Sequence, residues 1–159
     1  MAAGAGAQDT GKPGGGNSTP ASLILRRIPS SGELLPAIGL GTSGPFEVGA
    51  DDSARAPLRE VLREFFNAGA SLIDTSPMYS SAEAVLGDLL KPAQQEKAFI
   101  ATKVWTPGSG SAAEQKGVEQ MQRSMTLLRR QSVELMQVHN LVDLDAHLRT
   151  LRRCAPART

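Results

Sequence analysis

The 159-residue sequence predicts an α/β protein in which helices cover a parallel β-sheet. Short apolar runs bounded by turn residues alternate with longer segments of helical periodicity, giving the order βαβαβαβα after an N-terminal hairpin. The predicted strands are apolar on both faces, as in a parallel sheet buried under helices. Polar side chains follow the ends of successive strands, where α/β proteins place their functional sites.

The chain divides into three predicted segments. Residues 1–21 form a Gly- and Ala-rich stretch without the basic and apolar regions of a secretory signal, and we expect a flexible tail. Residues 22–153 are expected to form one domain, and residues 154–159 an irregular C-terminal tail. The domain opens with LILRRIP (23–29), the turn-like SSGE and LLPAIGL (34–40), which predict two short strands joined as a hairpin.

The first two βα units have recognisable starts and stops. The strand PAIGLGT (36–42) leads through a Gly- and Pro-rich loop to Asp51, Asp52 and Ser53, which are good helix-capping residues. Gly69 ends that helix, and the strand SLIDTS (71–76) follows. Ser80 and Glu83 match a capping box that opens the second helix, which Pro92 ends. The first helix buries Leu58, Leu62, Phe65 and Phe66, and the second Val85, Leu86, Leu89 and Leu90.

The next two units repeat this pattern. AFIATKVW (98–105) and VELMQVHN (133–140) are predicted strands, and a helix between them starts at Ser111 with Glu114 as its capping partner. The apolar face of that helix is Val118, Met121, Met125 and Leu128, and the last helix is outlined by Leu144, Leu148 and Leu151. His147, on this last helix, is expected at the surface. Periodicity alone leaves open half of a (β/α)₈ barrel or a small doubly wound sheet.

Gly39, Gly41 and Gly44 spell a G-x-G-x-x-G motif after a predicted strand. A Rossmann site needs such glycines to lead directly into a helix, with an acidic residue about 20 positions further on. Pro45 interrupts the path to the helix, and Asp74 is the first acid at a strand end. The motif therefore favours a glycine-rich βα loop.

Polar residues stand at the end of each strand: Thr42, then Asp74 with Tyr79, then Lys103, then His139. The carboxyl ends of parallel strands meet at one edge, so these side chains are expected on a common rim.

The segments that carry these residues resemble the aldo-keto reductases in order and approximate spacing: LPAIGLGT, LIDTSPMYSSAEAVLG, IATKVW and LMQVHN. The resemblance implies a (β/α)₈ TIM-barrel fold, here about four βα units or a half barrel. It implies a catalytic tetrad and NADPH (NADP) as cofactor. The tetrad falls on Asp74, Tyr79, Lys103 and His139, the cofactor contacts on Gly41, Thr42 and Asp74, and an aromatic wall of the substrate pocket on Trp105.

The chemistry of these residue types agrees with reduction of an aldehyde or ketone. A carbonyl that accepts a hydride must also receive a proton, and a phenol is a weak acid unless its anion is stabilised. The ammonium of Lys103 would favour the Tyr79 phenolate, Asp74 would hold that lysine, and a neutral His139 would polarise the carbonyl. The cofactor would supply the hydride.

The family pattern continues for four more βα units that carry most cofactor contacts, so we expect a truncated chain. A catalytically inactive fragment or interaction module is therefore the alternative function. The outer strands, 36–42 and 133–140, would leave open edges, and their inward faces, expected to include Ile38, Leu40, Met136 and Val138, predict self-association. Ser80 replaces a glycine found in many relatives.

Composition and charge limit the classes of partner that the protein is expected to bind. With 17 Lys and Arg against 16 Asp and Glu, the net charge of +1 gives no reason to expect nucleic acid or an anionic membrane. The single cysteine, Cys154, excludes an internal disulfide, and a cytoplasmic location is expected. No His, Asp and Glu cluster has metal-ligand spacing, which disfavours a metal- or phosphate-binding barrel. A small-molecule carbonyl is the expected partner.

Overall fold

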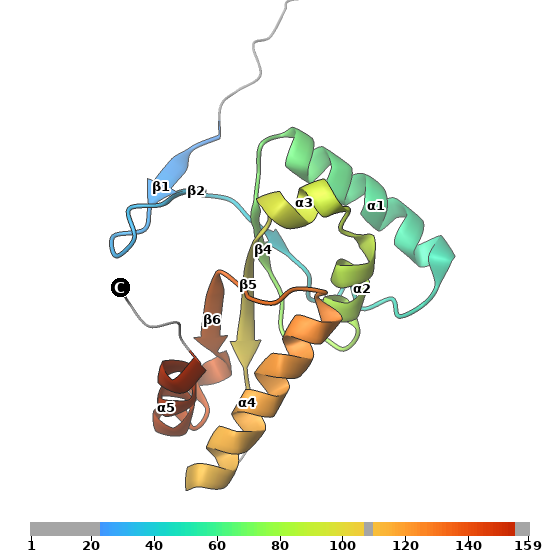
Figure 1. The fold of residues 1–159 in the computed structure, drawn as a ribbon. Coiled ribbons are helices and arrows are strands. Elements are labelled where there is room, and N and C mark those ends of the chain that lie inside the picture. Colours follow the sequence, from blue (N-terminus) through green and yellow to red (C-terminus); the bar gives the residue numbers. More distant parts are fainter. Residues whose placement is uncertain (1–22, 107–109, 155–159) are drawn as a thin grey trace, which may run out of the picture.

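A computed structural model describes residues 23–106 and 110–154, and within them confirms the α/β prediction. Strands β1 (Leu25–Arg27) and β2 (Leu34–Pro36) form the antiparallel hairpin. A parallel sheet follows, with strand order β3-β4-β5-β6. Its strands are β3 (Leu40–Gly41), β4 (Leu72–Asp74), β5 (Phe99–Val104) and β6 (Leu135–Val138). The hairpin lies toward the end of the sheet opposite the arrowheads of β5 and β6 (Figure 1).

Helices connect successive strands of the sheet. They are α1 (Asp52–Asn67), α2 (Ala82–Leu89), α3 (Pro92–Lys97), α4 (Gly110–Leu127), a 3₁₀ turn η1 (His139–Leu141) and α5 (Leu144–Cys154). The spatial order of the strands follows the sequence without the reversal that marks a doubly wound sheet. The described sheet is therefore half of a (β/α)₈ barrel, with one face toward the helices and one concave face.

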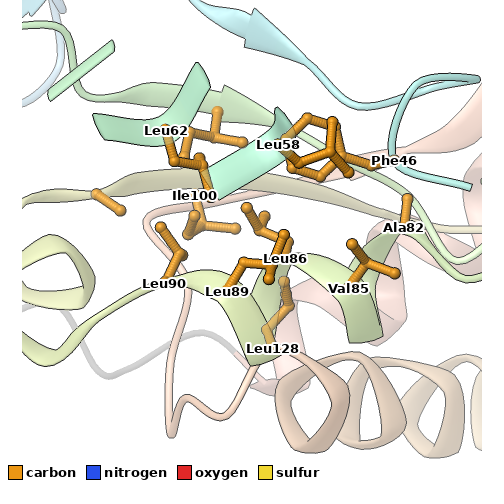
Figure 2. Close-up of a cluster of buried hydrophobic side chains, with 12 residues drawn as sticks. Phe46, Leu58, Leu62, Ala82, Val85, Leu86, Leu89, Leu90, Ile100 and Leu128 are labelled. Carbon is orange, nitrogen blue, oxygen red and sulfur yellow. The ribbon is translucent and has the colours of Figure 1, made fainter. Parts of the chain in front are cut away.

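The core lies between the helices and the convex face of the sheet (Figure 2). Leu58 and Leu62 of α1 belong to one buried cluster with Leu86 of α2 and with Ile73 and Ile100 of the sheet. Side chains alternate between faces along a strand, so Ile100, Thr102 and Val104 face the helices while Lys103 faces the concave side. Burial of this convex face fixes the register that also sets the direction of Lys103.

The start of α1 is as predicted. Asp51 Oδ1 accepts hydrogen bonds from the backbone N–H groups of Ser53 (2.9 Å) and Ala54 (3.3 Å), which satisfies two free donors of the first turn. Gly69 follows the helix with φ +82°, a left-handed conformation that favours glycine. Leu58 and Leu62 are buried, and Phe65 and Phe66 are partly buried against the core.

The predicted capping box of α2 is wrong. The N-cap is Ser81, whose Oγ instead accepts from the N–H of Gly49 (2.8 Å) in the loop before α1. Glu83 turns into the interior, where its carboxylate accepts from Thr102 Oγ1 (2.6 Å). Burial raises the pKa of Glu83, and the Thr102 hydrogen bond and the charges of Lys103 and Arg123 oppose this shift. The Ser80 and Glu83 spacing that predicted a capping box therefore belongs to a buried carboxyl group on Glu83, not to a helix cap.

Two other predicted boundaries shift. Pro92 follows α2 and also begins the short helix α3, where its missing N–H is harmless. Helix α4 begins at Gly110, so Ser111 lies inside the helix, and Glu114 accepts from Arg149 Nε (2.6 Å).

Helix α5 packs through a different face from the predicted one. Leu144 and Leu148 are each 37% exposed, whereas Ala146, His147 and Thr150 are buried. The expectation of a surface His147 is therefore wrong. Its imidazole Nε2 lies 3.3 Å from the backbone of Thr106. Helix α5 approaches α4 at Gly117, where an added Cβ would lie 3.1 Å from Thr150 and 3.3 Å from His147. Gly117 on α4 and Ala146 and Thr150 on α5 are small enough to allow this approach, whereas leucines on the same face would prevent it.

The two predicted inward-facing residues of β6 are wrong by one position. Met136 pairs with Thr102 and Val138 pairs with Val104. Thr102 and Val104 are fully buried against the helices, so the side chains of Met136 and Val138 also face the helices. Leu40 pairs with Ile73 and packs against the same core, but it also lines the hollow on the concave side, as predicted, and Ile38 precedes the sheet. The concave face carries Leu135 and Gln137 of β6, together with Gly41, Leu72, Asp74 and Ala101, around an open hollow of about 320 Å³.

Gly39 and Gly44, in the glycine-rich segment after β2, are required by the backbone geometry. A Cβ on Gly39 would lie 2.7 Å from the Leu72 carbonyl oxygen, so β3 can approach β4 only with glycine there. Gly44 has φ +81° in a turn well before α1 begins at Asp52. These features support the glycine-rich loop over the Rossmann reading.

The predicted tail 1–21 and residues 155–159 of the predicted C-terminal tail lie outside the described residues, and Cys154 is the last residue of α5. None of the helices in 23–106 and 110–154 has the length and apolarity needed to cross a bilayer.

Gly87→Ala should destabilise the protein by about 2 kcal/mol or more, because its Cβ would overlap the rigid backbone at the end of α4. The nearest atoms are the carbonyl oxygen of Leu127 and, at 3.0 Å, the carbonyl carbons of Leu127 and Leu128. Urea unfolding measures the change. Gly41→Ala is the control, because its Cβ would meet nothing within 4 Å. Equal stability of Gly87→Ala and the wild type would contradict this close packing of α2 on α4.

Candidate active site

An ion pair between neighbouring strands forms the base of the candidate site. Lys103, near the end of β5, donates from Nζ to both carboxylate oxygens of Asp74 on β4 (2.7 and 2.8 Å) and to the carbonyl of Thr75 (2.9 Å). The Lys103 side chain is 13% exposed and that of Asp74 is 43% exposed. The three protons of the Lys103 ammonium thus have acceptors in the protein, and its charge is held at the carboxyl edge of the sheet.

Tyr79 lies in the turn that follows β4. Its backbone N–H donates to the Ser76 carbonyl (3.0 Å), closing the turn. The Lys103 ammonium lies 5.0 Å from the centroid of the Tyr79 ring, within the range of a cation–π contact. The phenol and the ammonium are therefore neighbours on one rim, as predicted.

His139 enters from β6, the next strand along the sheet. Its ring meets the Tyr79 ring edge-on, with centroids 5.7 Å apart and planes at 80°. Partial burial lowers the pKa of His139 below the usual 6.5, the charge of Lys103 lowers it further, and the charge of Asp74 opposes the shift. This direction favours the neutral imidazole at pH 7, in which one ring nitrogen is a hydrogen-bond donor.

The structure brings together the four residues of the predicted tetrad, Asp74, Tyr79, Lys103 and His139, from three different strand ends. They combine a phenol, a cation, a carboxylate and a neutral imidazole. Such a set can donate a proton to, and hydrogen-bond, an oxygen that gains negative charge. The described residues contain no group of three or more His, Cys, Asp or Glu side chains that could hold a metal ion.

The predicted cofactor contacts are placed differently from one another. Gly41 pairs with Asp74 and lines the concave hollow, with open space beside its Cα. Thr42 is fully buried, and both its N–H (3.1 Å) and its Oγ1 (3.0 Å) donate to the Asp74 carbonyl. The Thr42 side chain thus holds the backbone of Asp74, and Gly41 is the accessible member of the pair.

Trp105 lies just after β5 and faces α4. Its backbone N–H donates to Gln120 Oε1 (2.6 Å), and it lines an outer hollow with Thr106, Lys116, Glu119, Gln120 and Arg123. The structure does not join it to the tetrad through a contact within the described chain, so a substrate role for Trp105 stays a prediction.

Sequence reasoning missed Ser76 and Thr75, which stand directly after β4. Ser76 Oγ lies 2.7 Å from His139 Nδ1, and the Thr75 carbonyl accepts from Lys103. Both follow Asp74 at a strand end, which is the same signal that selected Asp74. They were not predicted as site residues because Ser and Thr after a strand usually stabilise a turn through local hydrogen bonds.

The fold defines a βα-barrel protein whose polar side chains meet at the carboxyl edge of its strands. A sequence profile of the Aldo/keto reductase family matches residues 37–152. The methylglyoxal reductase YeaE of Escherichia coli K12 is 33% identical over 117 residues, covering 72% of this chain and 39% of that protein. The chain belongs to the Aldo/keto reductase family.

Solved structures agree with this assignment. A candidate aldo-keto reductase from Pseudomonas aeruginosa is 28% identical with a TM-score of 0.60, over 82% of this chain and 55% of that one. The Bombyx mori aldo-keto reductase in complex with NADP is 19% identical with a TM-score of 0.59, over 84% and 48% of the two chains. The chain thus spans about half the length of these solved relatives.

The charges of the ion pair should move the pKa of His139 in opposite directions. Lys103→Met should raise that pKa because it removes a nearby positive charge, and Asp74→Asn should lower it because it removes a negative one. NMR titration of the imidazole measures both. Lys97→Met, at the exposed end of α3, is the matched control and should leave the pKa unchanged. Shifts of one sign in both variants would contradict the arrangement.

Proposed function

We propose that this chain carries the proton-donating half of an NADPH-dependent reduction of an aldehyde or ketone to an alcohol, with Tyr79 as the acid. The observation that supports it best is the placement of the Lys103 ammonium, held by Asp74, 5.0 Å from the Tyr79 ring centroid. A cation held this close to the phenol ring can stabilise negative charge that develops during proton transfer. His139, neutral at pH 7, donates a hydrogen bond to the carbonyl oxygen.

A nicotinamide cofactor fits the concave side of the site. Gly41 leaves open space beside Asp74 at the rim of a hollow of about 320 Å³, and a bulkier residue there would fill it. When bound, the cofactor would supply the hydride. Gly41 and the Asp74 backbone, which Thr42 fixes, would hold it from this half. The NADP complex of the Bombyx mori relative supports NADP as the cofactor.

The carbonyl would lie within reach of both Tyr79 and His139, with Trp105 as an outer aromatic boundary. The name of the Escherichia coli relative makes methylglyoxal the first substrate to test. A cytoplasmic location is part of the proposal, and it is supported by a sequence whose single cysteine excludes an internal disulfide.

A catalytically inactive fragment or interaction module of the same family, which would keep the fold without turnover, is the alternative function.

Tyr79→Phe should lower the rate of methylglyoxal-dependent NADPH oxidation by about 10²–10⁴-fold, because the variant loses the acid but keeps the ring. Absorbance of NADPH measures the rate in the purified 159-residue chain. Lys97→Met, far from the site on α3, should keep the wild-type rate. Equal rates for Tyr79→Phe and the wild type would exclude Tyr79 as the acid. Absence of cofactor binding and turnover in the wild type would favour the interaction module.

We also propose that the chain self-associates. Within the described sheet, β3 and β6 each have one hydrogen-bonded neighbour, and Leu135 on the concave face is 41% exposed. Unpaired edges beside an exposed apolar face favour association. Sedimentation at micromolar concentration should therefore show a dimer or larger species, and Leu135→Gln should shift it toward monomer. A wild-type monomer that unfolds cooperatively would contradict the proposal.

A further inference from the structure

Ser76 is a buried hydroxyl with a constrained set of partners. It stands two residues after Asp74 and has no exposed surface, so water does not reach its side chain. Its Oγ accepts a hydrogen bond from the backbone N–H of Met78 (3.1 Å) and lies 2.7 Å from Nδ1 of His139. Among the described residues, the only acceptor within hydrogen-bond distance of its proton is that ring nitrogen.

A buried hydroxyl that leaves its proton unpaired loses roughly 1–3 kcal/mol, so the proton of Ser76 is directed at His139. A neutral imidazole that accepts at Nδ1 must carry its own proton on Nε2. Burial and the Lys103 charge lower the pKa of His139 against the opposing charge of Asp74, which favours the neutral ring at pH 7. The turn that holds Ser76 is the turn that holds Tyr79, because the Ser76 carbonyl accepts from the Tyr79 N–H.

We propose that Ser76 is a positioning residue that fixes His139 in its Nε2–H tautomer, leaving Nε2–H to donate to the substrate oxygen. The inference rests on the proposed function for its catalytic meaning, but the tautomer itself does not depend on turnover. Ser76 thus links the proton donor and the polarising group through one turn: its carbonyl holds the Tyr79 backbone and its hydroxyl sets the imidazole.

The test is a ¹⁵N NMR measurement of the two histidines, the only ones in the chain, with His139→Asn to assign the signals. At a pH where the ring is neutral, wild-type His139 should show an unprotonated Nδ1 and a fully protonated Nε2. In Ser76→Ala the two nitrogen shifts should move toward each other as both tautomers become populated. The buried His147 reports in the same spectrum whether the variant is folded.

Thr75→Val is the matched control. It removes the neighbouring buried hydroxyl, which has no hydrogen-bond partner, while keeping the backbone carbonyl that accepts from Lys103. The His139 shifts should stay at their wild-type values. A proton on Nδ1 in the wild type, or unchanged shifts in folded Ser76→Ala, would overturn the inference. The wild-type measurement decides the case even where Ser76→Ala does not fold.

Turnover separates this inference from the proposed function. If the chain reduces carbonyls, Ser76→Ala should lower kcat about tenfold, less than the ~10²–10³-fold loss of a whole oxyanion donor, because Tyr79 still contacts the ring. A fixed Nε2–H tautomer in a chain without turnover would support the inference and contradict the proposed function. A mixed tautomer in an active wild type would do the reverse.

Discussion

The ion pair between Lys103 and Asp74 is the interaction on which the rest of the candidate site depends. It joins β5 to β4 where both strands end, and the third bond of the ammonium, to the Thr75 carbonyl, fixes the first residue after β4. The chain then turns through Ser76 to Tyr79, so the positions of hydroxyl and phenol follow from where that turn starts. An ammonium with 13% exposure requires such partners, since an unpaired buried charge is costly. The ion pair therefore fixes where the turn to Tyr79 starts, and it also holds a positive charge at the site.

The fold and the tetrad could be predicted because each depends on a local pattern. Apolar runs, helix periodicity and Gly69 predict the order of strands and helices, and strand-end polarity selects Thr42, Asp74, Tyr79, Lys103 and His139. The resemblance to the aldo-keto reductases then selects the tetrad among them. The carboxyl ends of parallel strands converge on one side of the sheet, so the tetrad residues, although far apart in the sequence, could be predicted to lie on one rim.

The errors share a cause, which is tertiary packing that a local pattern does not contain. Glu83 has the spacing of a capping residue, yet the interior offers it the Thr102 hydroxyl, and the Ser81 hydroxyl is engaged by Gly49. His147 lies among leucines in the sequence, but Gly117 lets its face of α5 approach α4. The inward face of β6 was assigned one residue out of step, because a strand apolar on both faces gives no alternation to set the register. Ser76 was missed since its importance lies in a contact 63 residues away along the chain.

A double-mutant cycle on Asp74 and Lys103 tests the central claim most directly. Urea unfolding of Asp74→Asn, Lys103→Met and the double variant gives their coupling free energy. Asp74 is partly exposed, so we expect a modest coupling of about 1 kcal/mol, with the double variant less destabilised than the sum of the single ones. Single-variant effects that add within about 0.3 kcal/mol would show that the two side chains do not interact, and would contradict the rim described above.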